Sequence, residues 1–227
     1  MFHRTFAVAG LAALAACGGT TLPEMTPQTP LEAYTTRLTD AGTMAATLSG
    51  FDPTAFKAMP TSGDATFKGA GVLFVDPVFE RDADDILLVG DAVLNADFAK
   101  GRLTGDVTNF TGATKFTAAS ATIIPVSGSV KIGGVKSVIG NDVDDNRTDR
   151  PNDLYADYRG TVGLPDGQYR VNGTVNGQFL GTRTADGAFP IKGLYAVGEG
   201  VATRGTEGQA GFVEYGTTLE IVAKTPR

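Results

Sequence analysis

Short runs of alternating apolar and polar residues, separated by glycine-rich turns, fill the sequence from Asp64 to Ala223. In the run "VLNADFAKGRLTGDV", a turn at Lys100-Gly101 joins two such stretches. The apolar positions on one face of this hairpin are Leu94, Ala96, Phe98, Leu103 and Val107. Alternation with a period of two is typical of a β-strand that buries one face. The pattern predicts an all-β fold of about eight or nine strands.

A second hairpin follows the strong turn signal Pro165-Asp166-Gly167. Its apolar residues are Tyr169, Val171, Val175 and Phe179, and they alternate with Arg170, Asn172, Thr174, Asn176 and Gln178. Asp186-Gly187 marks a third hairpin turn.

A meander of so many antiparallel strands must protect its two edges, and closure into a barrel removes both. About eight strands enclose an interior that side chains can fill. The glycines Gly173, Gly177 and Gly181 fit sharply bent strands. We therefore expect an antiparallel up-and-down β-barrel over residues 59–227. The alternatives are an open sandwich and a transmembrane barrel, and the polar outer face with few aromatic residues argues against the second.

A helical pattern precedes the strands. Thr29 as N-cap, Pro30 at the first position and Glu32 three residues after the cap form a capping box. Apolar residues continue at helical spacing, and Gly50 can end the helix: Leu31, Tyr34, Leu38, Ala41, Ala45 and Leu48. Residues 31–58 are thus a helical segment, with an irregular packed segment as the alternative.

The first residues have the pattern of a secretory signal, with a basic start at Met1–Arg4 and an apolar run at Thr5–Ala16. The run is shorter than the roughly 20 residues that span a bilayer. Leu14, Ala15 and Ala16 precede the single cysteine, Cys17, and "LAAC" resembles the bacterial lipobox. The alternative is an ordinary signal peptide with an incidental cysteine.

The lipobox resemblance implies that residues 1–16 are removed and that Cys17 receives lipid. Residues 17–30, rich in Thr and Pro, form a flexible tether. Each buried methylene of an acyl chain contributes ~0.8 kcal/mol, so two or more chains give a stable membrane anchor. Gly18 stands where an inner-membrane retention signal would have Asp, which implies the outer membrane of a Gram-negative cell, on its periplasmic or its surface face.

Removal of the signal also removes His3, the only histidine, and Arg4, so the formal charge changes from −6 to −7. Without His or a free thiol, Ser-His-Asp and Cys-His catalysis and Cys/His zinc sites are excluded. The negative charge and the pI of about 4.8 argue against nucleic-acid binding. We expect a non-enzymatic protein without a cofactor, although a carboxylate pair of the glycosidase type stays open.

An acidic stretch, "NDVDDNRTDRPND", covers residues 141–153. Four of its residues fit positions 1, 3, 5 and 12 of a calcium-loop template: Asp142, Asp144, Asn146 and Asp153. Arg147 stands where that template requires glycine. A solvated loop without a metal is therefore expected, with calcium or a basic partner surface as the alternative.

Several stretches together resemble the C-terminal-type β-barrel of transferrin-binding protein B and its relatives among surface lipoproteins. They are "MPTSGDATFKGAG" (59–71), "GDAVLNADFAKGRLTGDVTNF" (90–110), "VNGTVNGQFLGT" (171–182) and "GAFPIKGLYAVGEGVATRG" (187–205). The family's aromatic-glycine-proline run is reduced here to Leu194-Tyr195-Ala196, followed by Glu199. The chain holds one barrel, where a transferrin receptor has two.

The resemblance implies a lipid-anchored binding module that recognises a protein or an iron- or haem-containing ligand. Closure of the barrel edges and the polar outer face predict a monomer. It also implies partnership with an outer-membrane receptor or a surface-lipoprotein export barrel. Two other functions stay open, a structural or adhesion lipoprotein and a lipocalin-like carrier of an apolar molecule. A barrel interior filled by side chains would argue against the carrier.

Overall fold

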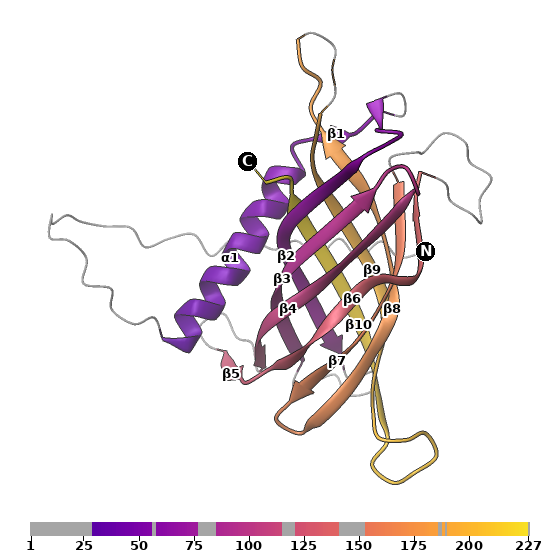
Figure 1. Ribbon diagram of the computed structural model, residues 1–227. Helices are drawn as coiled ribbons and strands as arrows, with labels where there is room; N and C mark the ends of the chain where they lie inside the picture. The colour runs from indigo at the N-terminus through magenta and orange to yellow at the C-terminus, as the bar shows by residue number, and fades with distance from the viewer. Residues whose placement is uncertain are drawn as a thin grey trace, which may run out of the picture.

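The structure is a computed structural model that describes residues 29–55, 58–76, 85–114, 121–140, 153–185, 188 and 190–226. Most of these residues belong to one β-barrel, with a helix on its outer surface (Figure 1). No helix within the described ranges is long and apolar enough to cross a membrane.

Eight strands form the barrel wall. They are β2 (Asp64–Asp76), β3 (Ile86–Asp97), β4 (Arg102–Thr114), β6 (Ser127–Ile139), β7 (Asp153–Leu164), β8 (Gly167–Gly181), β9 (Ile191–Arg204) and β10 (Val213–Lys224). Each strand pairs antiparallel with the next in the list, and β10 pairs antiparallel with β2. The predicted closed up-and-down barrel is confirmed, and the open sandwich is wrong.

The hairpin turns and two short strands complete the wall. The predicted turns at Lys100-Gly101 and at Pro165-Asp166 join β3 to β4 and β7 to β8, and Gly101 has a φ of 61°. The predicted turn at Asp186-Gly187 lies outside the described residues. β1 (Asp52–Pro53) extends the sheet beside β8, and β5 (Thr122–Ile124) pairs with β4.

The alternating residues face the barrel interior as expected. Leu94, Leu103 and Val107 have no exposed surface, and Tyr169 and Val171 are each 1% exposed. These side chains belong to one core cluster, to which all eight wall strands contribute. Burial of this apolar surface, at roughly 25 cal/mol per Å², is the main favourable term in folding.

The predicted helix is α1 (Pro30–Leu48), and its capping box is present. Thr29 Oγ1 accepts a hydrogen bond from the backbone N of Glu32, and Glu32 Oε2 accepts one from the backbone N of Thr29, at 3.2 and 2.8 Å. These bonds to Thr29 hold the pKa of Glu32 below its usual value. The helix ends at Leu48, with Ser49 as C-cap in place of the expected stop at Gly50.

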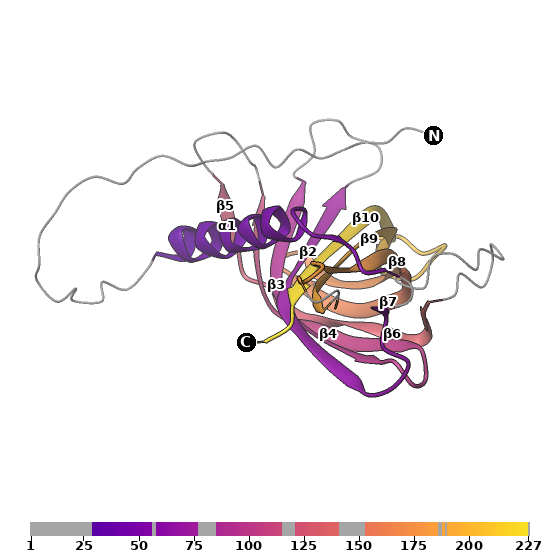
Figure 2. The ribbon, with the colours of Figure 1, turned by 90° about the horizontal axis from the view of Figure 1, so that it is seen from above.

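The helix packs on the outer wall of the barrel (Figures 1 and 2). Tyr34, Ala41 and Leu48 are 1–4% exposed, as the spacing predicted, whereas Leu31 is 42% exposed because it lies in the first turn, away from the wall. Barrel residues that pack in the same clusters as α1 are Ala70, Val72, Val89, Ala113, Leu180 and Val222.

The barrel has two distinct ends. One carries β1, the β3–β4 turn and the last residue of β10, and we call it the β1 end. The other carries the β7–β8 turn and the β9–β10 connection, which is the yellow loop in Figure 1, and we call it the Arg204 end. α1 runs between the two ends, with Tyr34 beside Leu87 at the start of β3 and Leu48 beside Gly193 at the start of β9.

Candidate functional site

The residues that sequence reasoning singled out lie mostly beyond the described ranges. Leu14, Ala15, Ala16 and Cys17 precede Thr29, so the lipid anchor stays a prediction. Asp142, Asp144 and Asn146 of the calcium template are also outside the described residues.

The fourth residue of that template, Asp153, begins β7. Its Oδ1 accepts a hydrogen bond from Gln178 Nε2 at 2.9 Å, and its carbonyl oxygen accepts one from the backbone N of Gly140 at 3.0 Å. These bonds fix Asp153 at the end of the barrel wall. Across the described part of the chain, no three or more His, Cys, Asp or Glu side chains come together to hold a metal.

The centre of the barrel contains a buried polar pair. Tyr158 on β7 and Thr217 on β10 face each other, with their hydroxyl oxygens 2.8 Å apart. A Cβ on Gly173 or Gly200 would lie only 2.6 or 2.4 Å from Tyr158 Oη. Gly173 thus leaves room for the tyrosine, a role beyond the strand bend that the sequence suggested. Burial raises the pKa of Tyr158, so its hydroxyl stays neutral at physiological pH.

Aromatic side chains close the β1 end. The Phe179 ring lies 5.6 Å from the rings of both Phe67 and Phe98, measured between centroids. Beside them, the backbone N of Thr54 donates to the carbonyl oxygen of Phe179 at 2.8 Å, and Met59 packs against the core cluster. The chain between α1 and β2 therefore covers this end of the barrel.

A polar and aromatic stack closes the Arg204 end. Arg204 Nη1 donates to the carbonyl oxygen of Asp166 at 2.8 Å and to its Oδ2. The guanidinium carbon lies 5.3 Å from the centre of the Tyr169 ring, which stacks on Tyr215 at 5.8 Å. Tyr169 Oη donates to Asp166 Oδ2 at 2.6 Å, and burial together with this acceptor raises the Tyr169 pKa. Within the described residues, a packed core occupies the barrel interior and these two clusters of side chains lie at its two ends.

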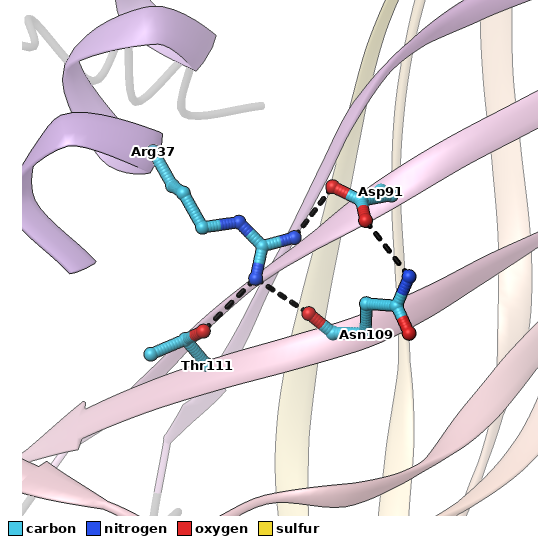
Figure 3. Close-up of polar contacts among 4 residues, drawn as sticks. All are labelled: Arg37, Asp91, Asn109 and Thr111. Atoms are coloured by element: carbon cyan, nitrogen blue, oxygen red, sulfur yellow. Dashed lines mark hydrogen bonds and ion pairs between the residues drawn. The ribbon is translucent and has the colours of Figure 1, made fainter. Parts of the chain in front are cut away.

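On the outer wall, Arg37 joins α1 to the barrel (Figure 3). Its Nη1 donates to the carbonyl oxygen of Asn109 at 2.5 Å and to Thr111 Oγ1 at 2.9 Å, and its Nη2 donates to Asp91 Oδ1 at 2.5 Å. Asn109 Nδ2 completes the ring by donating to Asp91 Oδ2 at 3.0 Å. We call these four residues the Arg37 cluster.

The Arg37 cluster sits on a β-bulge. The pairing of β3 with β4 shifts register between Val89 and Asp91, and Asn109 opposite this point has a φ of 53°. A bulge re-aims the side chains beside it, and asparagine tolerates the left-handed conformation better than most residues. The bulge thus places a carbonyl oxygen and a carboxylate where one guanidinium can contact both.

We expect Arg37→Ala to loosen α1 without unfolding the barrel. An exposed pair with supporting hydrogen bonds contributes about 1 kcal/mol, which corresponds to roughly fivefold faster hydrogen exchange of the α1 amides. Arg37→Lys should protect the α1 amides little better than Arg37→Ala, because one ammonium group cannot contact all three acceptors. Hydrogen exchange followed by mass spectrometry measures this, with Arg170→Ala on the outer face of β8 as control. Equal exchange in Arg37→Ala and Arg170→Ala would contradict the assignment.

A second feature of the outer wall is an exposed group on β9 and β10. Leu194, Ala196 and Leu219 belong to the core, so Tyr195, Val197 and Glu220 between or beside them point outward. Tyr195 is 36% exposed and Val197 39% exposed, although both are large and apolar. Glu199, also outward, is exposed two residues further along β9. We call Tyr195, Val197, Glu199 and Glu220 the β9–β10 outer patch.

Glu220 stands between two valines in this patch. The strand register places it opposite Val197 of β9 on one side and Val72 of β2 on the other. This partial burial raises the pKa of Glu220 above the usual glutamate value. Burial also raises the pKa of Tyr195, and the charge of Glu220 adds to that effect. The patch therefore holds a carboxylate in surroundings less polar than open water.

We expect Glu220→Gln to stabilise the protein at pH 7 by a fraction of a kcal/mol, because the charged form is the one that burial disfavours. The folded-state pKa is raised, so the folded state binds more protons than the unfolded state just above the normal glutamate pKa. The stability of the parent chain is thus lost as the pH rises through that window. Below the normal glutamate pKa, Glu220 is protonated in both states, so the stability gain of Glu220→Gln should vanish. Urea unfolding at pH 7 and at a pH below the normal glutamate pKa tests this, and a destabilised variant at pH 7 would contradict it.

Sequence reasoning missed both outer-wall features. The patch has a local signal in "LYAV" (194–197), where strict alternation would put polar residues at Tyr195 and Val197. The Arg37 cluster has no such signal, because Arg37 lies 54 positions from Asp91 and 72 from Asn109.

Comparison of the chain with protein-family models, with curated proteins and with solved structures found no match. The resemblance to the transferrin-binding protein B barrel therefore stays a prediction. The description of the Arg37 cluster and of the β9–β10 outer patch depends only on the geometry of this chain.

Proposed function

We propose that the protein is a lipid-anchored, non-enzymatic binding module of the Gram-negative outer membrane. The observation that carries this proposal is the closed barrel with a packed interior and covered ends. Such a barrel offers partners an outer wall and loops. This favours recognition of a macromolecule over transport of a small apolar molecule inside the barrel.

The anchor part of the proposal rests on "LAAC" at residues 14–17 and on the position of α1. From Cys17 to Thr29, the N-cap of α1, a tether of 12 residues reaches at most about 40 Å. The Arg37 cluster then fixes the helix that follows the tether to the barrel wall. The tether thus joins the lipid to the barrel at one defined place on its outer surface.

The resemblance to surface lipoproteins adds the class of ligand to the proposal, a protein or an iron- or haem-containing molecule. It also adds an outer-membrane receptor or a surface-lipoprotein export barrel as partner. A structural or adhesion lipoprotein is the outcome if the chain is anchored and its outer wall binds nothing.

We expect Cys17→Ser to abolish membrane retention, because the thioether and acyl chains form only on sulfur. The measurement is cell fractionation with metabolic palmitate labelling of the full chain. Cys17→Ala is the matched control and should behave like Cys17→Ser. Label on either variant, or retention of either in the membrane fraction, would refute the anchor.

A further inference from the structure

The contact between α1 and the barrel shows how this wall accepts a helix. Apolar residues of α1 cover an outward-facing strip that includes Val72, Val89 and Val222. At the rim of that strip, Arg37 of the helix pairs with Asp91 of the wall. The interface thus combines outward valines with one carboxylate, and the helix supplies the cation.

The β9–β10 outer patch continues the same strip beyond the helix. Val72, which packs against α1, lies opposite Glu220, and Glu220 lies opposite Val197. The patch again combines outward apolar side chains with carboxylates. Over residues 195–203 and 214–222, all of which the structure describes, no outward position carries Lys or Arg.

We propose that the β9–β10 outer patch docks an amphipathic helix of a partner protein, which lies beside α1 and places a lysine or arginine against Glu220 and Glu199. This rests on the proposed function as a binding module and names the chemistry of its partner. A helix is the occupant because the wall already holds one on the adjoining strip.

The dimensions of the wall fit a second helix. At the level of Val72, β9 is two strands away from β2, through β10. At about 4.8 Å per strand the two are roughly 10 Å apart. This equals the interaxial distance of about 8–10 Å between packed helices. A helix over β9 therefore contacts the patch and α1 at the same time.

The charges of the patch select a basic helix. Glu199, Glu214 and Glu220 all lie on the outer face of the β9–β10 hairpin, and the formal charge of the chain is −6. The methylene groups of a lysine can cover Val197 while its ammonium group reaches Glu220. The Tyr195 ring adds a face for cation–π contact. An acidic helix would meet like charges at the same positions.

The test uses two helix-stapled peptides of about 18 residues, long enough for about five helical turns. They share one leucine stripe and differ in polar residues, all lysine in one and all glutamate in the other. Binding to the purified full chain is measured by fluorescence anisotropy. We expect the lysine peptide to bind at least about tenfold more tightly than the glutamate peptide. Equal binding, or no binding of the lysine peptide, overturns the proposal.

Matched variants locate the site. Val197→Lys places a positive charge in the patch, and Val93→Lys places the same charge at an equally exposed valine on β3, since the two residues are 39% and 40% exposed. We expect Val197→Lys to weaken binding of the lysine peptide by about tenfold. Val93→Lys should weaken it much less. Equal weakening means attraction by net charge alone and overturns the proposal. Tyr195→Ser is a second, uncharged variant that should weaken binding, and circular dichroism verifies its fold.

The proposal and the anchor fail in different ways. A chain that is palmitate-labelled but does not discriminate between the peptides retains the anchor and loses the docking surface. A chain that discriminates between the peptides but is never labelled retains the docking surface and loses the anchor.

Discussion

Gly200→Val is expected to destabilise the barrel severely. A Cβ at this position would lie 2.2 Å from the carbonyl oxygen of Asn172, 2.7 Å from the Cα of Gly173 and 2.4 Å from Tyr158 Oη. Two of these three atoms belong to the β8 backbone, which is fixed by its pairing with both β7 and β9. Relief of the clash therefore requires separation of β8 from β9, or displacement of Tyr158 from Thr217.

Each of these changes has a large cost. Overpacking a core usually costs about 1–3 kcal/mol when side chains can adjust. Here the backbone cannot adjust, and the buried Thr217 hydroxyl would lose its partner, so we expect more than about 4 kcal/mol. That loss approaches the whole stability of a domain at the lower end of the usual range of about 5–15 kcal/mol.

Far-UV circular dichroism and urea unfolding measure the effect of Gly200→Val. The control is Gly50→Ala after α1, where the nearest atom to a Cβ is Thr47 O at an ordinary 3.5 Å. The control should unfold close to the parent chain. A cooperative, parent-like urea transition for Gly200→Val would show that the space left by Gly200 beside Tyr158 is not required for folding.

Phe179→Ala should destabilise the barrel by about 3–5 kcal/mol, the usual cost of removing a fully buried phenylalanine. Phe179 has no exposed surface and holds the rings of Phe67 and Phe98 together at the β1 end. The cavity lies beneath the segment that covers this end, where the backbone of Thr54 bonds to Phe179. That segment limits collapse of the cavity from one side.

The urea midpoint of Phe179→Ala gives the size of this effect. Phe74→Ala is the matched control, because Phe74 is a half-buried residue on β2 that alternates with the inward-facing Leu73 and Val75. We expect its cost to be less than half that of Phe179→Ala. Similar losses of unfolding free energy in the two variants would mean that the aromatic cluster at the β1 end stabilises the barrel no more than an outward-facing ring does.

The barrel could be predicted because its information is local. Each strand must bury one face, so the alternation in "ADFAKGRLTGDV" assigns inward and outward positions without knowledge of the neighbours. The turn at Lys100-Gly101 and the capping box at Thr29 and Glu32 are equally local, and both are present. Closure followed from the number of strands and the need to protect their edges.

The candidate site could not be predicted in the same way, because its contacts join distant parts of the chain. Tyr158 and Thr217 are 59 positions apart, and only the register of β7 to β10 brings them together. The left-handed conformation of Asn109 arises from a register shift between two strands, which no short motif encodes. Tyr195 and Val197 were visible as a break in alternation, but their exposure depends on where α1 lies.

The pairing of β10 with β2 also affects how the chain is made. Residues 213–224 form β10, the last of the eight wall strands to leave the ribosome, and this strand closes the wall by pairing with both β9 and β2. Until then the nascent chain has two unpaired strand edges, the state most prone to aggregation. A premature stop codon between the end of β9 at Arg204 and Val213 would make that state permanent.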